Sequence, residues 1–292
     1  MKAVDFDYVR AASVHEACEL LAAGDADRKL IAGGQTLVPL MAMRLARPAM
    51  LIDINEIAEL RGIEEYADAV TIGACTRQAA ALDSPIVLRR LPLLARALAH
   101  VGHTQTRNRG TVGGSIVHAD PSAEIPLVAA TLDARLTLAS ADGEEEVAAE
   151  EFFLAPMVTS IRPDQCLTRI RFPAWPGRAG CGFEEISIRA GDFAIVAAAA
   201  QVELGADGRC RRAAVGVGGA AATPLRFDTV AQALTGQVPD EARLREAAQL
   251  VRDLVEPDDD LHASAEYRRR TAAVLVERAL GAAVRAAQEA SA

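Results

Sequence analysis

The chain reads TRNRGTVGGSIVHADPSAEIP from Thr106 to Pro126, and this stretch sets a double glycine between two hydroxyl side chains. The glycines are Gly113 and Gly114, and the hydroxyls belong to Thr111 and Ser115, with Val112 between them. A glycine pair lets the backbone approach a ligand closely, because no Cβ stands in the way. Backbone N–H groups exposed in such a turn can bind phosphate oxygens. The stretch therefore indicates a candidate phosphate-binding loop.

A second segment has the same pattern, because the apolar pair Leu30-Ile31 leads into Ala32, Gly33, Gly34, Gln35 and Thr36. We interpret both segments as an apolar strand that ends in a glycine loop. Double glycines are also common in ordinary turns, so either segment alone is weak evidence. Two of them in one chain favour a single pyrophosphate that is bound by both loops.

Two carboxylates, Asp120 and Glu124, follow the central double glycine. They could form a catalytic acid–base pair, or they could bind the hydroxyls of a sugar. From the residues alone we favour helix capping, because Asp120 precedes Pro121 and Glu124 then falls within the first turn of the helix.

A third glycine pattern, Gly216-x-Gly218-x-x-Ala221, formally matches a dinucleotide-binding fingerprint. That fingerprint requires a helix to begin at once, and an acidic residue at the end of a second strand about 20 residues later. Thr223-Pro224 interrupts the segment instead. We therefore expect a strand that leaves its sheet through small residues.

Length and charge limit the possible function classes. The chain has 292 residues, is 51% hydrophobic and carries a formal net charge of -9, which does not favour nucleic acid as a partner. Its longest uncharged run, Leu30–Met43, has fourteen residues, whereas a membrane span needs about 20. The first residues, MKAVDFDYVR, lack the apolar region of a signal peptide. We therefore expect a cytoplasmic protein with no membrane span.

Cysteines and histidines give no metal-binding pattern. The five cysteines are at least fifteen residues apart, so neither structural zinc nor an iron–sulfur cluster is expected in this chain. His100 and His103 form H-x-x-H, and would share a face on one helix, but no third ligand is nearby. We expect no metal site.

Hydrophobic periodicity predicts three units: residues 1–56, 57–176 and 177–292. In the first, a helix capped by Ser13 and ending at Gly24 lies among short strands. The second combines strands with a helical stretch at 84–100 that Pro92 divides into two. A Pro- and Gly-rich segment at 173–182 is the best candidate for a linker. The third, with strands and then two long terminal helices, is typical of an α+β domain.

Four motifs in order resemble one family: AGGQT at 32–36, TVGGS at 111–115, ADPSAE at 119–124 and GDFA at 191–194. They are similar to the FAD-binding medium subunit of molybdenum hydroxylases, as in aerobic carbon monoxide dehydrogenase and the flavin domain of xanthine dehydrogenase. The resemblance implies an α+β fold, in which a two-part FAD-binding domain of the vanillyl-alcohol-oxidase (PCMH) type precedes a small α+β C-terminal domain.

The resemblance also implies a cofactor site. Both glycine loops would hold the phosphates and ribityl chain of FAD, and Asp120 and Glu124 would approach its polar parts, so these carboxylates are not expected to be caps alone. The basic Lys29 would lie close to the cofactor, Leu167 beside the adenine and Phe193 over the isoalloxazine ring. The full set of expected cofactor-binding residues is Lys29, Ala32, Gly33, Gly34, Gln35, Thr36, Thr111, Val112, Gly113, Gly114, Ser115, Asp120, Glu124, Leu167 and Phe193. No catalytic residue of this chain is implied.

Partners follow from the same resemblance. A large molybdopterin subunit would hold the molybdenum cofactor and choose the substrate, and a small subunit would carry two [2Fe–2S] clusters. FAD in this chain would take their electrons and pass them to an external acceptor, in a dimer of heterotrimers. Gln35-Thr36 and Phe193 stand where carbon monoxide dehydrogenase has His-Ser and Tyr, and Ser115 where relatives often have Asn. These departures do not favour carbon monoxide as the substrate.

Two alternatives stay open from the sequence. A self-contained flavin oxidoreductase would need a catalytic base over the flavin, for which His118 is the best candidate. A scaffold that has lost FAD is the other, although both glycine loops are intact.

Overall fold

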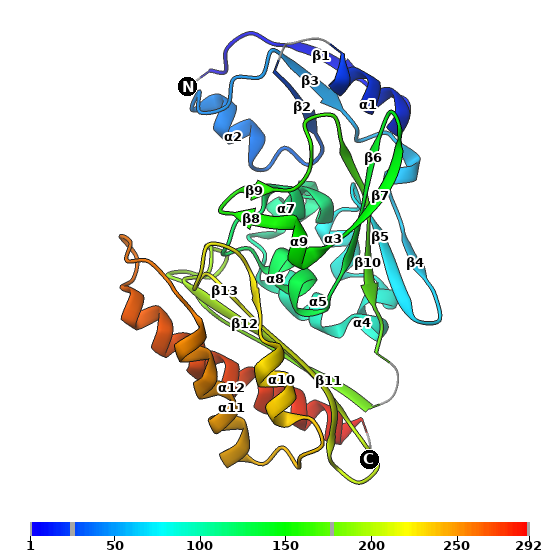
Figure 1. The fold of residues 1–292 in the computed structure, drawn as a ribbon. Helices are drawn as coiled ribbons and strands as arrows, with labels where there is room; N and C mark the ends of the chain where they lie inside the picture. Colours follow the sequence, from blue (N-terminus) through cyan, green and yellow to red (C-terminus); the bar gives the residue numbers. More distant parts are fainter. Residues whose placement is uncertain (1, 24–26, 176–177, 291–292) are drawn as a thin grey trace.

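The computed structural model describes residues 2–23, 27–175 and 178–290, which form three layered parts in chain order (Figure 1). The N-terminal part lies at one end, the middle part follows, and the C-terminal sheet with its long helices lies at the other end. The boundary predicted at residues 56/57 stays a prediction, and the boundary at 176/177 and the helix end at Gly24 fall outside the described residues.

The N-terminal part is a three-stranded parallel sheet in the order β1-β3-β2. Ser13 caps the first helix as predicted, because its Oγ accepts a hydrogen bond from the Glu16 amide at 3.1 Å. Strand β1 is largely exposed, so its residues lack the alternation of apolar and polar side chains that marks a half-buried strand. The elements are β1 (Asp7–Arg10), α1 (Val14–Ala22), β2 (Arg28–Ile31), α2 (Leu37–Ala42) and β3 (Met50–Asp53).

The middle part is a five-stranded antiparallel sheet, β4-β5-β10-β6-β7, covered by helices. Pro92 divides the helical stretch at 84–100 into two helices, as expected. The strands are β4 (Ile63–Glu65), β5 (Ala69–Gly73), β6 (Arg135–Ser140), β7 (Gly143–Ala148), β10 (Cys166–Pro173) and the hairpin β8 (Phe153–Ala155) with β9 (Val158–Thr159). The helices are η1 (Ala58–Leu60), α3 (Gln78–Leu82), α4 (Pro85–Arg90), α5 (Pro92–His100), α6 (Thr104–Arg109), α7 (Val112–His118), α8 (Glu124–Thr131) and α9 (Ala149–Phe152).

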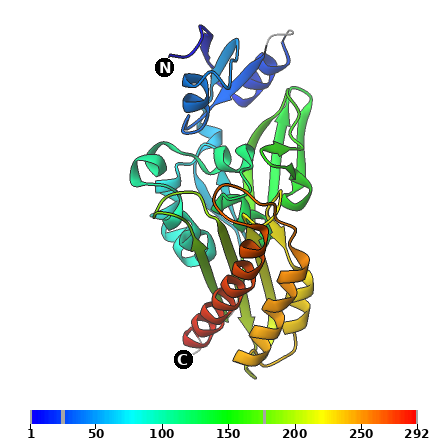
Figure 2. The ribbon, with the colours of Figure 1, turned by 90° about the vertical axis from the view of Figure 1, so that its left-hand side faces the viewer.

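The C-terminal part is a four-stranded antiparallel sheet, β11-β12-β13-β14, with helices on one face. Figure 2 shows the long helix α12 crossing this sheet. The elements are β11 (Arg178–Ile186), β12 (Val196–Leu204), β13 (Cys210–Gly218), β14 (Leu225–Arg226), α10 (Asp228–Leu234), α11 (Glu241–Leu254) and α12 (Ala265–Glu289).

Strand β12 is buried on both faces, which explains its run of alanines. Ala197 and Ala199 pack into the core of the middle part. Val196, Ala198 and Ala200 pack into the core under α11 and α12. Because small side chains let layers approach closely on both sides, the C-terminal sheet is held firmly against the middle part.

The expected linker at 173–182 was partly wrong, because β11 already includes Gly180 and Gly182. A Cβ at either glycine would lie 2.1 Å from a carbonyl oxygen of α12, at Ala283 and Ala279 respectively. These glycines therefore let α12 pack closely on β11, a role that the Gly-rich composition of the segment alone could not show.

The expectation for the Gly216-x-Gly218 pattern is confirmed. Strand β13 ends at Gly218, and the next helix, α10, begins only at Asp228, so the Rossmann-like pattern is not a dinucleotide site. His100 ends α5 and His103 precedes α6, so the two histidines do not share one helix. Within the described ranges, no helix is both long and apolar enough to cross a membrane.

Candidate functional site

The first glycine loop lies between β2 and α2, at the junction of the N-terminal and middle parts. Gly34 has a φ of +70°, in the left-handed region that favours glycine. Across the part of the chain that the structure describes, no hydrogen-bond partner is found for the amides of Gly33, Gly34, Gln35 and Thr36. Successive free amides around a left-handed residue form a concavity that binds anions. The loop thus has the donors that a phosphate requires.

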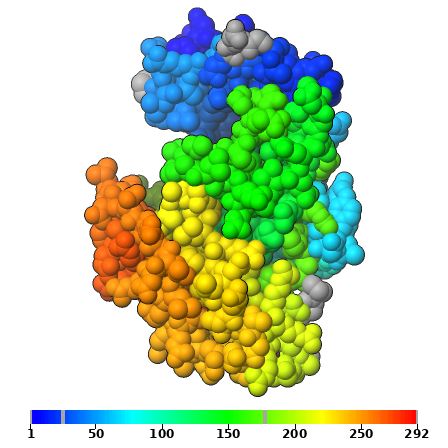
Figure 3. Space-filling model, viewed as in Figure 1, coloured from blue at the N-terminus to red at the C-terminus, as the bar shows by residue number. Residues whose placement is uncertain are grey.

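The two glycine loops touch each other. A Cβ built on Gly33 would lie 2.4 Å from the carbonyl oxygen of Arg109 and 2.8 Å from the Cα of Gly110. Gly33 is therefore required for loop-to-loop contact, rather than only for the approach of a ligand. Figure 3 shows an indented surface where the blue N-terminal part meets the green middle part.

The second glycine pair differs from its prediction. Helix α6 precedes it instead of a strand, and Gly113 and Gly114 form the first turn of α7. The Thr111 side chain is the N-cap and accepts from the Gly114 amide at 3.0 Å, while the Gly113 amide donates to Ala74 at 2.9 Å. Because these two amides already have protein partners, they are not free to bind a phosphate. What the segment offers an anion is the positive end of the α7 helix dipole.

The two glycines of this pair also have different roles. A Cβ on Gly113 would lie 2.5 Å from the Cβ of Ala74, so Gly113 allows α7 to pack on the end of β5. Gly114 is exposed, and a Cβ there would meet only the hydroxyl of Thr111, at 2.7 Å. Gly114 is therefore the residue of the pair whose backbone a ligand can approach.

The predicted capping role of Asp120 is wrong. Helix α8 begins at Glu124, and its N-cap residue, Ala123, makes no side-chain cap. Asp120 instead accepts from the Ser122 amide at 2.8 Å, and its carbonyl accepts from the Ala123 amide at 3.0 Å. The turn that Asp120 forms with its own neighbours delays the start of the helix.

Glu124 is a buried carboxylic acid at the first position of α8, with only 5% of its surface exposed. Burial raises its pKa to about 8, against the effect of its own amide, and the charges of Glu185 and Asp120 raise it further. Among the described residues, no side chain donates a hydrogen bond to this carboxyl group. A ligand that carries hydroxyl or N–H groups could therefore donate a hydrogen bond to this carboxyl group without displacing another side chain.

Glu185 was not found from the sequence, and it lies close enough to Glu124 to influence it. Its side chain is 3% exposed, its Oε2 has no hydrogen-bond partner within the described ranges, and burial raises its pKa to about 7. His100 Nδ1 lies 3.9 Å from this Oε2, and burial lowers the pKa of His100. The strand pattern of β11 gave no sign that this glutamate points inward.

Glu185 and His100 line a groove of about 870 Å³ between the α5–α6 turn and the segment after β11. The ring of His103 packs against Gly191 on the rim of this groove, where a Cβ would lie 2.6 Å from the ring. Phe193, just beyond Gly191, is 63% exposed. A large exposed aromatic ring beside a groove is a suitable platform for a flat ligand.

The remaining expected residues are less closely gathered. Leu167 is buried in β10, opposite Leu138 of β6, in the core of the middle part. Lys29 is exposed on β2, with its Nζ 3.8 Å from Asp27. In the described residues, no hydrogen bond or ion pair connects Lys29 to either glycine loop. Nor does that part of the chain contain a group of three or more acidic, His or Cys side chains arranged to hold a metal ion.

Two family models match the chain in succession. The first, "FAD binding domain in molybdopterin dehydrogenase", matches residues 4–175, and the second, "CO dehydrogenase flavoprotein C-terminal domain", matches residues 182–283. Subunit alpha of the 6-hydroxypseudooxynicotine dehydrogenase complex from Paenarthrobacter nicotinovorans is 39% identical, over 99% of this chain and 97% of that protein.

Solved structures agree over the whole length. A carbon monoxide dehydrogenase chain from Hydrogenophaga pseudoflava superposes with a TM-score of 0.94 at 36% identity, covering 98% of this chain and 99% of that one. A chain of quinoline 2-oxidoreductase from Pseudomonas putida 86 superposes with a TM-score of 0.93 at 35% identity, with full coverage of both. The two-part FAD-binding fold with its C-terminal domain, as expected from the sequence, is confirmed.

Proposed function

The chain belongs to the family of FAD-binding medium subunits of molybdenum hydroxylases, and we propose that it works as the electron-transfer flavoprotein of such an assembly. In this role it takes electrons from the [2Fe–2S] clusters of a small partner subunit and passes them to an external acceptor. The observation that carries the proposal is the contact between the two glycine loops, with four successive free amides in the first.

The residues present fit FAD. The amides of Gly33–Thr36 would bind its pyrophosphate, and the exposed backbone at Gly114, with Thr111 and Ser115 beside it, would meet the same group from the other side. Glu124 would accept hydrogen bonds from hydroxyl or N–H groups of the cofactor, with Asp120 nearby. Leu167, Phe193 and Lys29 complete the proposed site.

Bound FAD supplies the redox chemistry, and the chain supplies position and electrostatics. The free amides face a negative pyrophosphate, and burial favours the neutral, protonated forms of Glu124 and Glu185 near neutral pH, so these two groups add little negative charge of their own. Phe193 offers an apolar surface without the hydroxyl of a tyrosine. No residue of this chain acts on the substrate in this proposal.

The partners belong to the same proposal. A large subunit with the molybdenum cofactor would hydroxylate the substrate, a small subunit would carry two [2Fe–2S] clusters, and two such heterotrimers would pair. The relatives named above belong to enzymes named for different compounds, 6-hydroxypseudooxynicotine, carbon monoxide and quinoline, so we assign substrate choice to the large subunit.

Purification from the native host under mild conditions tests the relay. A tagged chain should bring down one large and one small subunit, with molybdenum, iron and flavin in the ratio that one molybdenum cofactor and two [2Fe–2S] clusters require. The same chain expressed alone should carry flavin but neither molybdenum nor iron. Isolation from the host as a flavoprotein free of metal-containing partners would contradict the relay and favour a self-contained oxidoreductase.

A further inference from the structure

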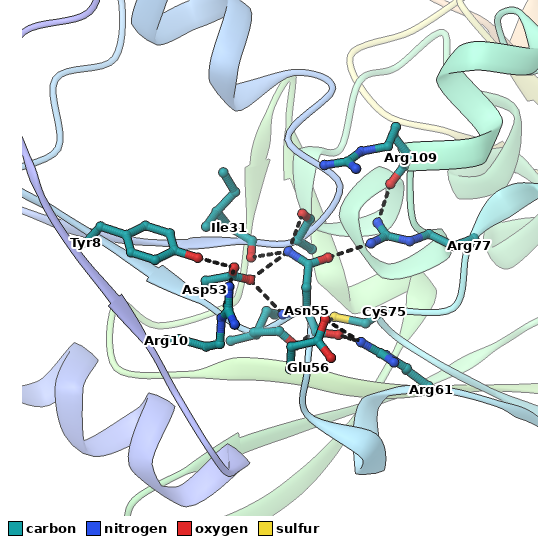
Figure 4. Close-up of polar contacts among 12 residues, drawn as sticks. Tyr8, Arg10, Ile31, Asp53, Asn55, Glu56, Arg61, Cys75, Arg77 and Arg109 are labelled. Carbon is teal, nitrogen blue, oxygen red and sulfur yellow. Dashed lines mark hydrogen bonds and ion pairs between the residues drawn. The ribbon is translucent and has the colours of Figure 1, made fainter.

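Asn55 lies two residues beyond β3 and bonds to the backbone that enters the first glycine loop. Its Nδ2 donates to the carbonyl oxygen of Ala32 at 2.8 Å and to that of Ile31 at 3.4 Å. Its Oδ1 accepts from Nη2 of Arg77 at 2.8 Å. Figure 4 shows the amide of Asn55 between these groups. One side chain therefore joins the first loop to a residue of the middle part.

Arg77 continues the connection to the second loop. Its Nη1 donates to the carbonyl oxygen of Arg109, and its backbone pairs with Thr111 in an isolated bridge. The carbonyl of Arg109 is the same group that a Cβ on Gly33 would strike. Burial lowers the pKa of Arg77, and the neighbouring charge of Arg109 lowers it further. Arg77 thus holds the second loop at the point where it meets the first.

Asp53 fixes the orientation of Asn55. Its Oδ1 accepts from the backbone amide of Asn55 at 2.8 Å and from Nδ2 at 2.7 Å, while its Oδ2 accepts from the hydroxyl of Tyr8. Burial opposes ionisation of Asp53, but these hydrogen bonds outweigh it and hold its pKa below the ordinary value. An ionised acceptor at this position leaves the Asn55 amide only one orientation that satisfies both of its ends.

We propose that Asn55 and Arg77 are positioning residues that hold the two glycine loops at the separation FAD requires. The proposal rests on the proposed function, because it presumes that the loops bind FAD. The polar ends of both side chains are engaged by protein atoms, so they act through the backbone of the loops rather than on the cofactor. Since the link crosses from the N-terminal part to the middle part, its loss lets the loops separate without disturbing either core.

FAD titration of the full chain tests this proposal, with the dissociation constant and the melting temperature of the FAD-free protein measured together. Asn55→Leu and Arg77→Met should each weaken FAD binding about tenfold or more, because each removes hydrogen bonds that include a charged or buried partner. Arg77→Lys, which keeps the charge and one donor, should recover part of the affinity. Arg90→Met is the matched control, because Arg90 also donates to main-chain carbonyls, at Tyr66 and Ala67, but does so at the far end of the middle part.

The outcomes separate positioning from general stability. If Arg77→Met weakens FAD binding and Arg90→Met does not, at similar melting temperatures, the proposal holds. Wild-type affinity in both Asn55→Leu and Arg77→Met would overturn it, as would an equal loss in Arg90→Met. Should Arg77→Met fail to fold, the comparison rests on Arg77→Lys and Asn55→Leu. If the wild-type chain itself takes up no FAD, the proposed function fails and this inference fails with it.

Discussion

Gly33→Ala should purify with little or no flavin, with an affinity for FAD at least about tenfold below that of the wild type. The added Cβ would lie 2.4 Å from the carbonyl oxygen of Arg109, and the backbone of Gly110 is also within 2.8 Å. Because the obstruction is backbone and not the end of a flexible side chain, the loops must move apart to admit even one methyl group. The ratio of flavin to protein, together with an FAD titration, measures the effect.

Gly281→Ala is the control for this change. Gly281 lies inside α12, where a Cβ would meet only the terminal Nη1 of Arg285, at 3.3 Å. Alanine is the better helix former by about 1 kcal/mol, so this variant should keep its flavin and be at least as stable as the wild type. A Gly33→Ala protein with wild-type flavin content would show that the two loops do not need their close contact.

Glu124→Gln should change how the stability of the FAD-free protein depends on pH. Glu124 has a pKa of about 8 in the folded chain, against an ordinary value of 4.5, so the folded state binds its proton more tightly than the unfolded state. Its contribution to the free energy of unfolding is complete below about pH 4.5. It is lost as the pH rises through 8, at up to about 1.4 kcal/mol per pH unit. Glutamine carries no proton to lose, so the variant should gain stability relative to the wild type as the pH rises from 5 to 8.

The difference in stability between Glu124→Gln and the wild type isolates the effect of Glu124, because the other titrating groups are present in both proteins. The lowered pKa of His100 acts in the opposite direction, because partial desolvation disfavours the protonated imidazole, and its protonation therefore destabilises the fold as the pH falls. Melting temperatures measured at half-unit pH steps should show a difference between Glu124→Gln and the wild type that grows toward pH 8. Glu146→Gln, at an exposed position of β7, should show a constant gap. Parallel curves for Glu124→Gln and wild type would contradict the burial of a protonated acid at this site.

Elements with local signals were predictable from the sequence. Ser13 and Pro92 each fix a helix through nearby residues, and the structure confirms both. Strands β4 and β7 were missed because their mostly exposed, glutamate-rich sequences lack the alternation of a half-buried strand. Those strands exist because their neighbours in the sheet supply the pairing, which is tertiary information.

The sequence predicted the candidate site as a list of positions, but not as an arrangement. Motifs at 32–36 and 111–115 indicated two glycine loops, yet the sequence could not distinguish Gly113, which packs on Ala74, from Gly114, which faces outward. Asn55 and Arg77 lie 22 residues apart, and Arg77 and Arg109 lie 32 apart, so no local pattern marks their connection. Glu185 was hidden in a strand whose inward face depends on the helices packed against it.

The central claim is that this chain binds FAD between its two glycine loops. Its most direct test is the visible absorption spectrum of the purified full chain, with the heat-released cofactor identified by chromatography and FAD titrated into any colourless fraction. The account predicts flavin bands, FAD as the released cofactor and no iron–sulfur absorption. A colourless chain that takes up no FAD on titration would contradict it.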